Sequence, residues 1–183
     1  YRGWQNRQDD SNERTWREAG DRIVILEDSD GDGRADSSTV FAQDEDLIAP
    51  TGICVLGERV FVSCSPSIFV FYDDNGDDRA DRKETFLTGF GGKDHDHGVH
   101  SIVPGPDGRL YFTVGNAGPH IVSDASGWTL RAGSQYQPLT GSSTDNSGKN
   151  QPSVELNSGG LTSDDGKVYV GGLALSIRPD GTD

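Results

Sequence analysis

Methionine is absent from this chain of 183 residues, and cysteine occurs only twice. A chain without an initiating methionine is expected to be an internal piece of a longer protein. Two cysteines are too few for a disulfide scaffold, and their spacing fits no zinc motif. Cys54 and Cys64 both lie in apolar segments, which favours buried thiols. A disulfide between them is the alternative if the protein is exported.

Basic residues and long apolar runs are also scarce. Sixteen Lys and Arg oppose thirty Asp and Glu, which gives a formal net charge of −14 at pH 7. Such a charge repels phosphate backbones and anionic lipid headgroups, so it argues against nucleic acids and membrane surfaces as partners. No apolar run approaches the roughly 20 residues of a membrane-spanning helix. We therefore expect no direct membrane insertion by this segment.

Glycine, in contrast, is abundant, and the sequence contains an internal repeat. Segment 22–42 (RIVILEDSDGDGRADSSTVFA) aligns without a gap with segment 67–87 (SIFVFYDDNGDDRADRKETFL), at an offset of 45 residues. Each copy is typical of two apolar strands joined by an acidic turn. Two further strands are predicted between the copies, at 51–56 and 59–63. Four short strands in roughly 40–45 residues is the period of a propeller blade.

We therefore predict an all-β fold, a partial β-propeller with about three to four blades present. Residues 1–46 are expected to end one blade, residues 47–89 to form the next, and residues 90–183 to belong to the following blades. Within this last part, strands are predicted at 100–103, 109–114, 168–170 and 173–177. Segment 133–160 is rich in Ser, Gly, Asn, Gln and Thr, which predicts a long loop or a disordered segment.

The acidic turns have the ligand spacing of a calcium loop. In the first turn carboxylates occupy relative positions 1, 3, 5 and 9, and Gly33 stands at position 6, where an EF-hand loop turns sharply. The second turn has Asp78 in place of that glycine. Solvated turns are the alternative, because Asp, Asn and Gly all favour turns, but repulsion among the carboxylates favours a bound cation. The candidate Ca²⁺ ligands are Asp28, Asp30, Asp32, Arg34 (carbonyl) and Asp36, and Asp73, Asn75, Asp77, Arg79 (carbonyl), Asp81 and Glu84.

Three of the four histidines, His95, His97 and His100, fall within six residues. Imidazoles clustered in this way can bind a metal or move protons. On a strand, His95 and His97 would share one face while His100 points to the other, which does not favour a three-histidine zinc site. The alternative is a polar loop that leads into a strand.

The residues around and after this cluster carry a resemblance to a known family. Segments 97–103 (HGVHSIV), 104–108 (PGPDG) and 109–116 (RLYFTVGN) resemble the glucose/sorbosone dehydrogenase family. Together with the acidic hairpins and segment 163–172 (SDDGKVYVGG), they resemble a subgroup described as membrane-bound dehydrogenases, whose longer members often carry a c-type haem domain. The resemblance covers most of the chain from about Gly20 onward. It implies a six-bladed propeller that uses pyrroloquinoline quinone (PQQ), in a protein exported to the periplasm or the cell exterior.

The resemblance also implies site residues. In that family a catalytic histidine precedes the strand and accepts the substrate's hydroxyl proton while a hydride passes to the quinone, and this role falls to His97. Asn116 stands where the family has an aspartate; it can orient an imidazole by hydrogen bonding but cannot stabilise an imidazolium by charge. The implied function is oxidation of a sugar or alcohol, with a c-type cytochrome as candidate electron acceptor. The alternative is a non-catalytic, calcium-stabilised propeller that serves as a binding or scaffolding module.

Overall fold

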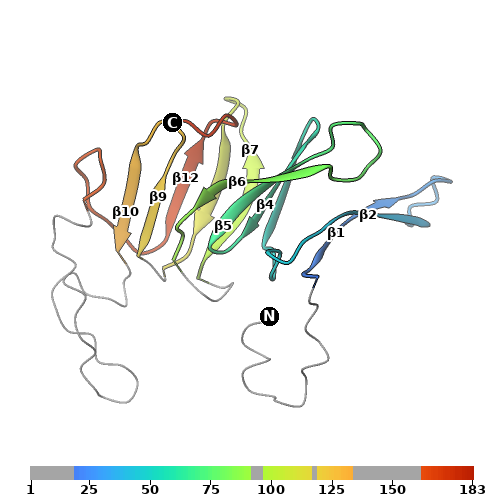
Figure 1. Cartoon of the computed structure of the whole chain (residues 1–183), viewed down its shortest axis with the longest axis horizontal. Coiled ribbons are helices and arrows are strands. Elements are labelled where there is room, and N and C mark those ends of the chain that lie inside the picture. Colours follow the sequence, from blue (N-terminus) through green and yellow to red (C-terminus); the bar gives the residue numbers. More distant parts are fainter. Residues whose placement is uncertain (1–18, 92–96, 117–118, 134–161) are drawn as a thin grey trace, which may run out of the picture.

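The computed structural model describes residues 19–91, 97–116, 119–133 and 162–183 (Figure 1). All regular secondary structure within these ranges is β, in twelve strands, so the predicted all-β fold is confirmed. No helix in this part of the chain has the length and apolarity needed to cross a membrane. His95 and all but the first residue of the loop expected at 133–160 lie outside the described residues.

The strands form four sheets, arranged as a partial propeller-like fold (Figure 1). All neighbouring strands are antiparallel except β10 and β11, which are parallel. Sheet A contains β1 (Arg22–Glu27) and β2 (Ser37–Gln43). Sheet B contains, in order, β3 (Gly52–Leu56), β4 (Arg59–Cys64), β5 (Ser67–Tyr72) and β6 (Arg82–Thr88). Sheet C contains, in order, β12 (Leu173–Ile177), β8 (Leu110–Val114) and β7 (Val99–Pro104), and sheet D contains β11 (Tyr169–Val170), β10 (Thr129–Gly133) and β9 (His120–Ser123).

The sequence repeat is also a repeat of structure. Strands β1 and β2 pair with a register shift between Ile23 and Val24, and β5 and β6 pair with a register shift between Ile68 and Phe69. These two irregularities lie at equivalent positions of the repeat. Sheet A therefore corresponds to the outer hairpin of sheet B, and the sheet B strands β3 and β4 have no counterparts among the described strands of sheet A.

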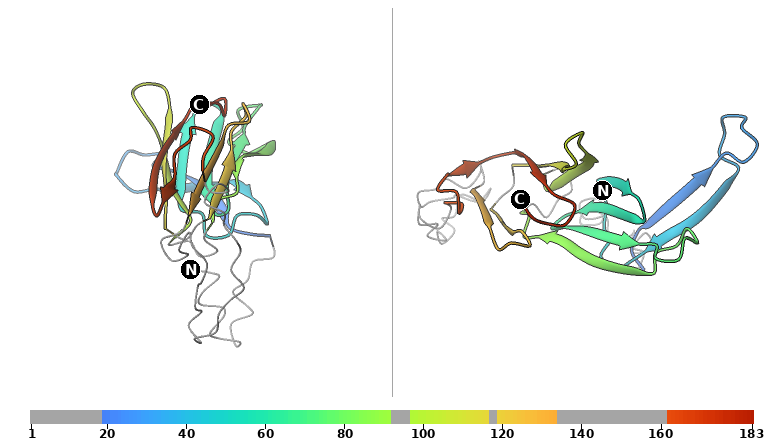
Figure 2. Two further views of the ribbon diagram at one scale, coloured as in Figure 1. Left: turned by 90° about the vertical axis from the view of Figure 1, so that its left-hand side faces the viewer. Right: turned by 90° about the horizontal axis from the view of Figure 1, so that it is seen from above.

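Sheets C and D are interleaved along the chain. Strand β12 pairs with β8, although the strands of sheet D lie between these two strands in the sequence. Sheet D thus forms from an insertion between the second and third strands of sheet C. Seen from above, the β1–β2 hairpin projects at one end of the molecule, and sheet D lies toward the other end (Figure 2).

The central strands of sheet B, β4 and β5, are buried on both faces, which explains their unbroken apolar runs. One face packs on sheets C and D through a cluster that includes Phe61, Ile68 and Phe112. The other face packs on sheet A through a cluster that includes Val62 and Phe71. A strand with one solvated face would alternate apolar and polar residues, whereas a sheet covered on both sides does not.

The two cysteines belong to these opposite faces. Cys54 lies in the core that sheet B shares with sheets C and D, and Cys64 lies in the core that it shares with sheet A. Both are buried free thiols, so the disulfide considered above is not formed. Burial raises the pKa of both thiols, which keeps them protonated and unreactive at neutral pH.

Side-chain hydroxyls of sheet B hold the backbone of β7. Thr51 Oγ1 donates to the carbonyl of Val99 at 2.7 Å, and Ser63 Oγ donates to the carbonyl of Ser101 at 2.7 Å. The N–H of Val99 donates to Ser65 Oγ at 2.9 Å. Ser101 has φ of +53° within the stretch where the β7–β8 register shifts. These bonds satisfy backbone groups of β7 that do not pair with β8, because β7 is the edge strand of sheet C.

Phe61→Ala tests the core between the sheets. Phe61 is fully buried and lies edge-on to Phe86, with ring centroids 5.0 Å apart. Truncation should lower the free energy of unfolding by about 3–5 kcal/mol because it removes apolar contacts and leaves a cavity. Urea unfolding measures the loss. Leu26→Ala, at a position 68% exposed, should change stability by less than about 0.5 kcal/mol. Equal losses in the two variants would contradict this packing.

Candidate functional site

The first acidic loop, between β1 and β2, wraps around the carboxylate of Asp28. Oδ1 of Asp28 accepts hydrogen bonds from the backbone N–H of Gly31 at 2.8 Å and of Asp32 at 3.1 Å. Oδ2 accepts from the N–H of Gly33 at 2.8 Å. The bond from Gly33, followed by those from Gly31 and Asp32, holds the pKa of Asp28 below its ordinary value of 3.8 against the opposing effect of desolvation. Asp28 is therefore a carboxylate at neutral pH.

Three carboxylates of this loop converge. Oxygens of Asp28, Asp30 and Asp36 all lie within 4.8 Å of one another. Asp36 is oriented by Ser29, whose N–H and Oγ–H donate to its two oxygens at 3.2 and 2.8 Å. Calcium binds oxygens at roughly 2.3–2.6 Å, so two ligand oxygens on one ion lie at most about 5 Å apart. The spacing of these three groups fits a single Ca²⁺ ion.

The second loop, between β5 and β6, repeats this network one repeat later. Asp73 accepts from the N–H groups of Gly76, Asp77 and Asp78 at 2.7, 3.2 and 3.0 Å. Asp78 adopts φ of +63°, close to the +86° of Gly33 at the equivalent position. The aspartate therefore takes the left-handed conformation for which glycine was expected, a conformation that Asp and Asn adopt more readily than most residues.

Of the remaining predicted ligands of the second loop, Asn75 and Asp81 contact each other, whereas Glu84 contacts residues of the adjoining strands. Asn75 Nδ2 donates to Asp81 Oδ1 at 3.1 Å, so these two side chains meet as their counterparts do in the first loop. Glu84 lies on β6, where its carboxylate binds Arg82 Nη1 at 2.5 Å and accepts from the hydroxyl of Tyr72 at 3.1 Å. These contacts engage Glu84 with residues of the two strands.

The carboxylates at position 5 of the two loops accept hydrogen bonds from backbone N–H groups of the same loop. Asp32 Oδ1 accepts from the N–H of Arg34 at 2.8 Å, and Asp77 Oδ1 accepts from the N–H of Arg79 at 3.1 Å. Neither carboxylate belongs to a convergent group of three acidic side chains among the described residues.

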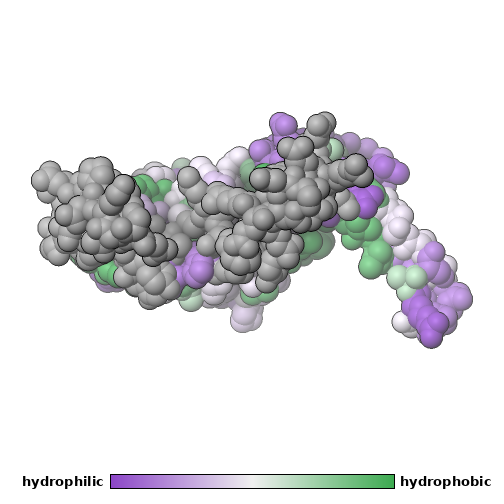
Figure 3. All heavy atoms as spheres, turned by 90° about the horizontal axis from the view of Figure 1, so that it is seen from below, coloured by the Kyte–Doolittle hydropathy of each residue, from purple (hydrophilic) through white to green (hydrophobic). Residues whose placement is uncertain are grey.

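Both acidic loops lie at the same side of the molecule (right in Figure 1). The tip of the β1–β2 hairpin forms a hydrophilic projection (Figure 3).

His97 lies in the turn just before β7, and Asn116 lies just beyond the end of β8. Gly115 brings these two segments together: its N–H donates to the carbonyl of Gly98 at 2.7 Å. A Cβ atom at Gly115 would lie only 2.5 Å from the Cα, carbonyl carbon and carbonyl oxygen of His97. This close approach therefore requires glycine, and it places the His97 backbone beside the residue that precedes Asn116. We call residues 97–98 and 115–116 the His97 edge.

His100, the other described histidine of the cluster, is part of β7. It is half-buried, and its carbonyl accepts from Thr113 Oγ1 at 3.3 Å. The strand therefore runs through His100, and the described residues give no convergence of histidines on a metal site.

His120 is the residue that sequence analysis missed. It is fully buried at the start of β9. Nδ1 of His120 accepts from the N–H of Gly91 at 2.9 Å, so the neutral ring carries its proton on Nε2, which donates to the carbonyl of Gly115 at 3.1 Å. Desolvation by burial lowers the pKa of His120 below its ordinary value of 6.5. An uncharged imidazole thus fixes Gly115 and, through it, the His97 edge.

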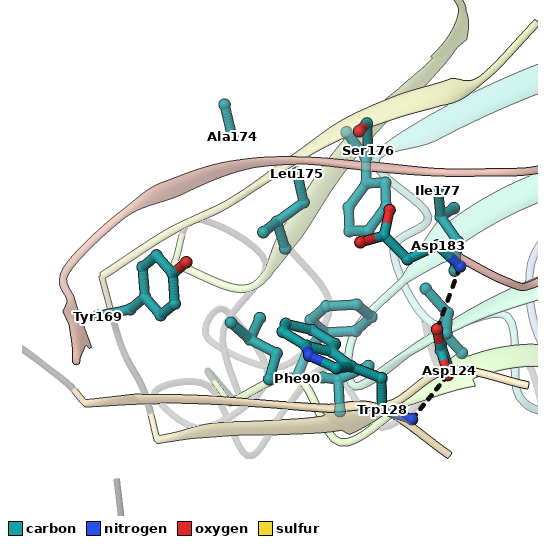
Figure 4. A pocket seen from close by; sticks show the side chains of 13 residues that line it. Phe90, Asp124, Trp128, Tyr169, Ala174, Leu175, Ser176, Ile177 and Asp183 are labelled. Atoms are coloured by element: carbon teal, nitrogen blue, oxygen red, sulfur yellow. Dashed lines mark hydrogen bonds between the residues drawn. The ribbon is translucent and has the colours of Figure 1, made fainter. Parts of the chain in front are cut away.

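A pocket of about 240 Å³ lies between sheets C and D, and no residue of the His97 edge lines it (Figure 4). Phe90 and Trp128 lie on one side of it and Leu175 on the other. None of the residues singled out from the sequence lines this pocket. Asp124 lies at one end of it, where it accepts from the N–H of Trp128 at 2.9 Å.

Comparison with known proteins identifies a family without assigning a function. A family model described as a domain of unknown function (DUF7133) matches residues 4–170. No curated protein and no solved structure matches the chain. The match covers most of the sequence, including the acidic loops, the His97 edge and His120.

His120→Ala tests the buried imidazole. The substitution removes the partner of the Gly91 N–H and of the Gly115 carbonyl, both in half-buried residues, and should lower the free energy of unfolding by about 1–3 kcal/mol. Because the folded-state pKa lies below the ordinary 6.5, the unfolded chain binds a proton first as pH falls. The contribution of His120 should therefore be complete above pH 6.5 and decline below it.

Urea unfolding at several pH values between 5 and 8 separates this effect from other titrations. The wild-type protein should lose more stability than His120→Ala between pH 7.5 and pH 5.5. Parallel pH profiles for the two proteins would show that His120 does not become harder to protonate on folding.

Proposed function

We propose that this chain, which belongs to the DUF7133 family, is a calcium-stabilised section of a β-propeller that serves as a binding or scaffolding module. The observation that carries the proposal is the convergence of Asp28, Asp30 and Asp36 within one ion's reach. No ion pair with a described Lys or Arg compensates these three carboxylates. Their mutual repulsion would be relieved by a divalent cation.

The repeated loop supports a structural role for the ion. Both loops close outer hairpins, and the second contacts sheet A, where the N–H of Ala80 donates to the carbonyl of Phe41 at 2.8 Å. Lys83 of β6 also binds Asp44 and Asp46 at 2.5 and 2.7 Å. A cation in either loop would therefore stiffen a hairpin that helps to hold two sheets together.

Calcium should raise the melting temperature of the protein. A site saturated at 100 times its Kd adds about 2.7 kcal/mol, which corresponds to roughly 5–10 °C for a chain of this size. Differential scanning calorimetry with Ca²⁺ and with chelator measures the shift. The double variant Asp36→Asn/Asp81→Asn should lose most of it, because each loop then lacks a charged ligand.

A matched control changes charge without touching the loops' carboxylates. Glu45→Gln/Glu58→Gln removes the same two charges at exposed positions and should retain the calcium shift. A melting temperature unaffected by calcium and chelator in the wild-type protein would leave the loops as solvated turns.

A second candidate function is oxidation of a sugar or alcohol by a PQQ-type dehydrogenase exported from the cytoplasm, with a c-type cytochrome as electron acceptor. It is favoured by the close approach of His97 to Gly115, next to Asn116. His97 would accept the hydroxyl proton, and Asn116 would orient the imidazole. PQQ would supply the hydride acceptor. Its carboxylates need cationic partners, and the Arg and Lys ion pairs of the described residues lie elsewhere, as in Arg131–Asp164.

Dye reduction by aldoses tests this candidate in the intact parent protein supplied with PQQ and Ca²⁺. Turnover should fall by at least about 100-fold in His97→Ala, the usual contribution of a general base. His100→Ala, which alters the neighbouring half-buried histidine, is the control and should retain turnover. Activity that survives His97→Ala would remove the base role from this residue. The calcium shift in melting temperature would be unaffected by that result, so the two candidates are tested separately.

A further inference from the structure

The face of sheet B that packs on sheet A is covered unevenly. Two rows of apolar side chains cross this face in register, each with one residue on β3, one on β4 and one on β5. The residues on β4 and β5 are buried, whereas Ile53 and Val55 on β3 are 50% and 67% exposed. The rows are Ile53–Val62–Phe69 and Val55–Val60–Phe71.

This exposure follows from the make-up of sheet A. Sheet A has two described strands, and the repeat equates β1 with β5 and β2 with β6. In sheet B the edge of β5 that faces away from β6 is paired with β4. The equivalent edge of β1 carries no strand among the described residues. Strands added there, in the places of β4 and β3, would extend sheet A on the side of its β1 edge.

We propose that the edge of β1 to which no described strand pairs and the exposed face of β3 form one docking surface for a two-stranded antiparallel β-hairpin with the pattern of β3–β4. Such a hairpin would pair through its backbone with β1 and would lay alternate apolar side chains over Ile53 and Val55. The surface is continuous with the apolar core that already joins sheets A and B through Ile23 and Val62. The proposal goes beyond calcium binding and does not depend on it.

The other face of sheet B shows why this occupant fits. There the edge strand β3 is covered: Cys54 is buried in the core that includes Val99 and Ile102 of β7. Strand β5 of the outer hairpin contributes Ile68 to that same core. Its counterpart in sheet A, Ile23, is buried against sheet B in the same way. The interface between sheets A and B therefore resembles, around β1, the interface that sheet B forms with sheets C and D around β5. A hairpin beside β1 would cover β3 on the side of sheet A, as β7 covers it on the other side.

The experiment supplies the hairpin to the chain itself. A copy of residues 51–65 is fused ahead of Tyr1, so that the tether raises its effective concentration to the millimolar range. A fusion with the same residues in scrambled order is the control. The hairpin fusion should melt several degrees above the scrambled fusion, and the amide hydrogens of β1 should exchange at least tenfold more slowly. Equal melting and equal exchange in the two fusions would overturn the proposal.

Substitutions in the host chain locate the docking surface. Ile53→Lys/Val55→Lys should cancel the gain of the hairpin fusion while changing the unfused chain little, since both positions are exposed. Ile121→Lys, at a position 51% exposed on β9, should leave the gain intact. A gain that survives the double substitution would place the hairpin elsewhere. Protection of β1 that grows with the concentration of the unfused chain would show a second copy as occupant and would also overturn the proposal.

Discussion

The burial of β4 and β5, the central strands of sheet B, on both faces is the constraint on which the rest of the structure depends. An isolated sheet has two sides, and Val60, Phe61 and Val62 on β4 point alternately to both of them. Leaving either side in water would expose large apolar side chains, at roughly 25 cal/mol for each Å². Sheet B is stable only between two neighbours, so its sequence specifies a stack of sheets. The repeat that places Ile23 and Ile68 in successive cores is the consequence of that requirement.

Polar contacts fix the relative positions of the sheets, which apolar packing alone leaves undetermined. Apolar side chains determine that sheets B and C face each other, but their contacts are not directional. The hydroxyls of Thr51 and Ser63 bind particular carbonyls of β7 and so set its position along β3 and β4. At the other side, the imidazole of His120 binds Gly115. His120 of sheet D therefore holds Gly115 of the His97 edge, and sheet B holds the adjoining strand β7.

Sequence reasoning succeeded where structure is local and failed where it is not. The offset of 45 residues predicted the strands of sheets A and B, because hairpin pairing follows from alternation and turn residues close in the chain. The pairing of β8 with β12 joins segments separated by all of sheet D, and no local pattern encodes it. His120 was missed for the same reason: its partners Gly91 and Gly115 belong to other segments, and a single histidine in a short apolar strand gives no signal.

In the calcium-binding role proposed for them, the acidic loops would be ordered before an ion arrives. In each loop one aspartate, Asp28 or Asp73, gathers three backbone N–H groups, which keeps the turn closed although like charges are close together. A pre-organised loop loses little conformational entropy when an ion binds, so more of the binding energy appears as affinity. The same bonds use part of each carboxylate's accepting capacity. The geometry therefore suits an ion that tolerates variable coordination, as Ca²⁺ does with six to eight oxygens, better than Mg²⁺, which demands a near-ideal octahedron.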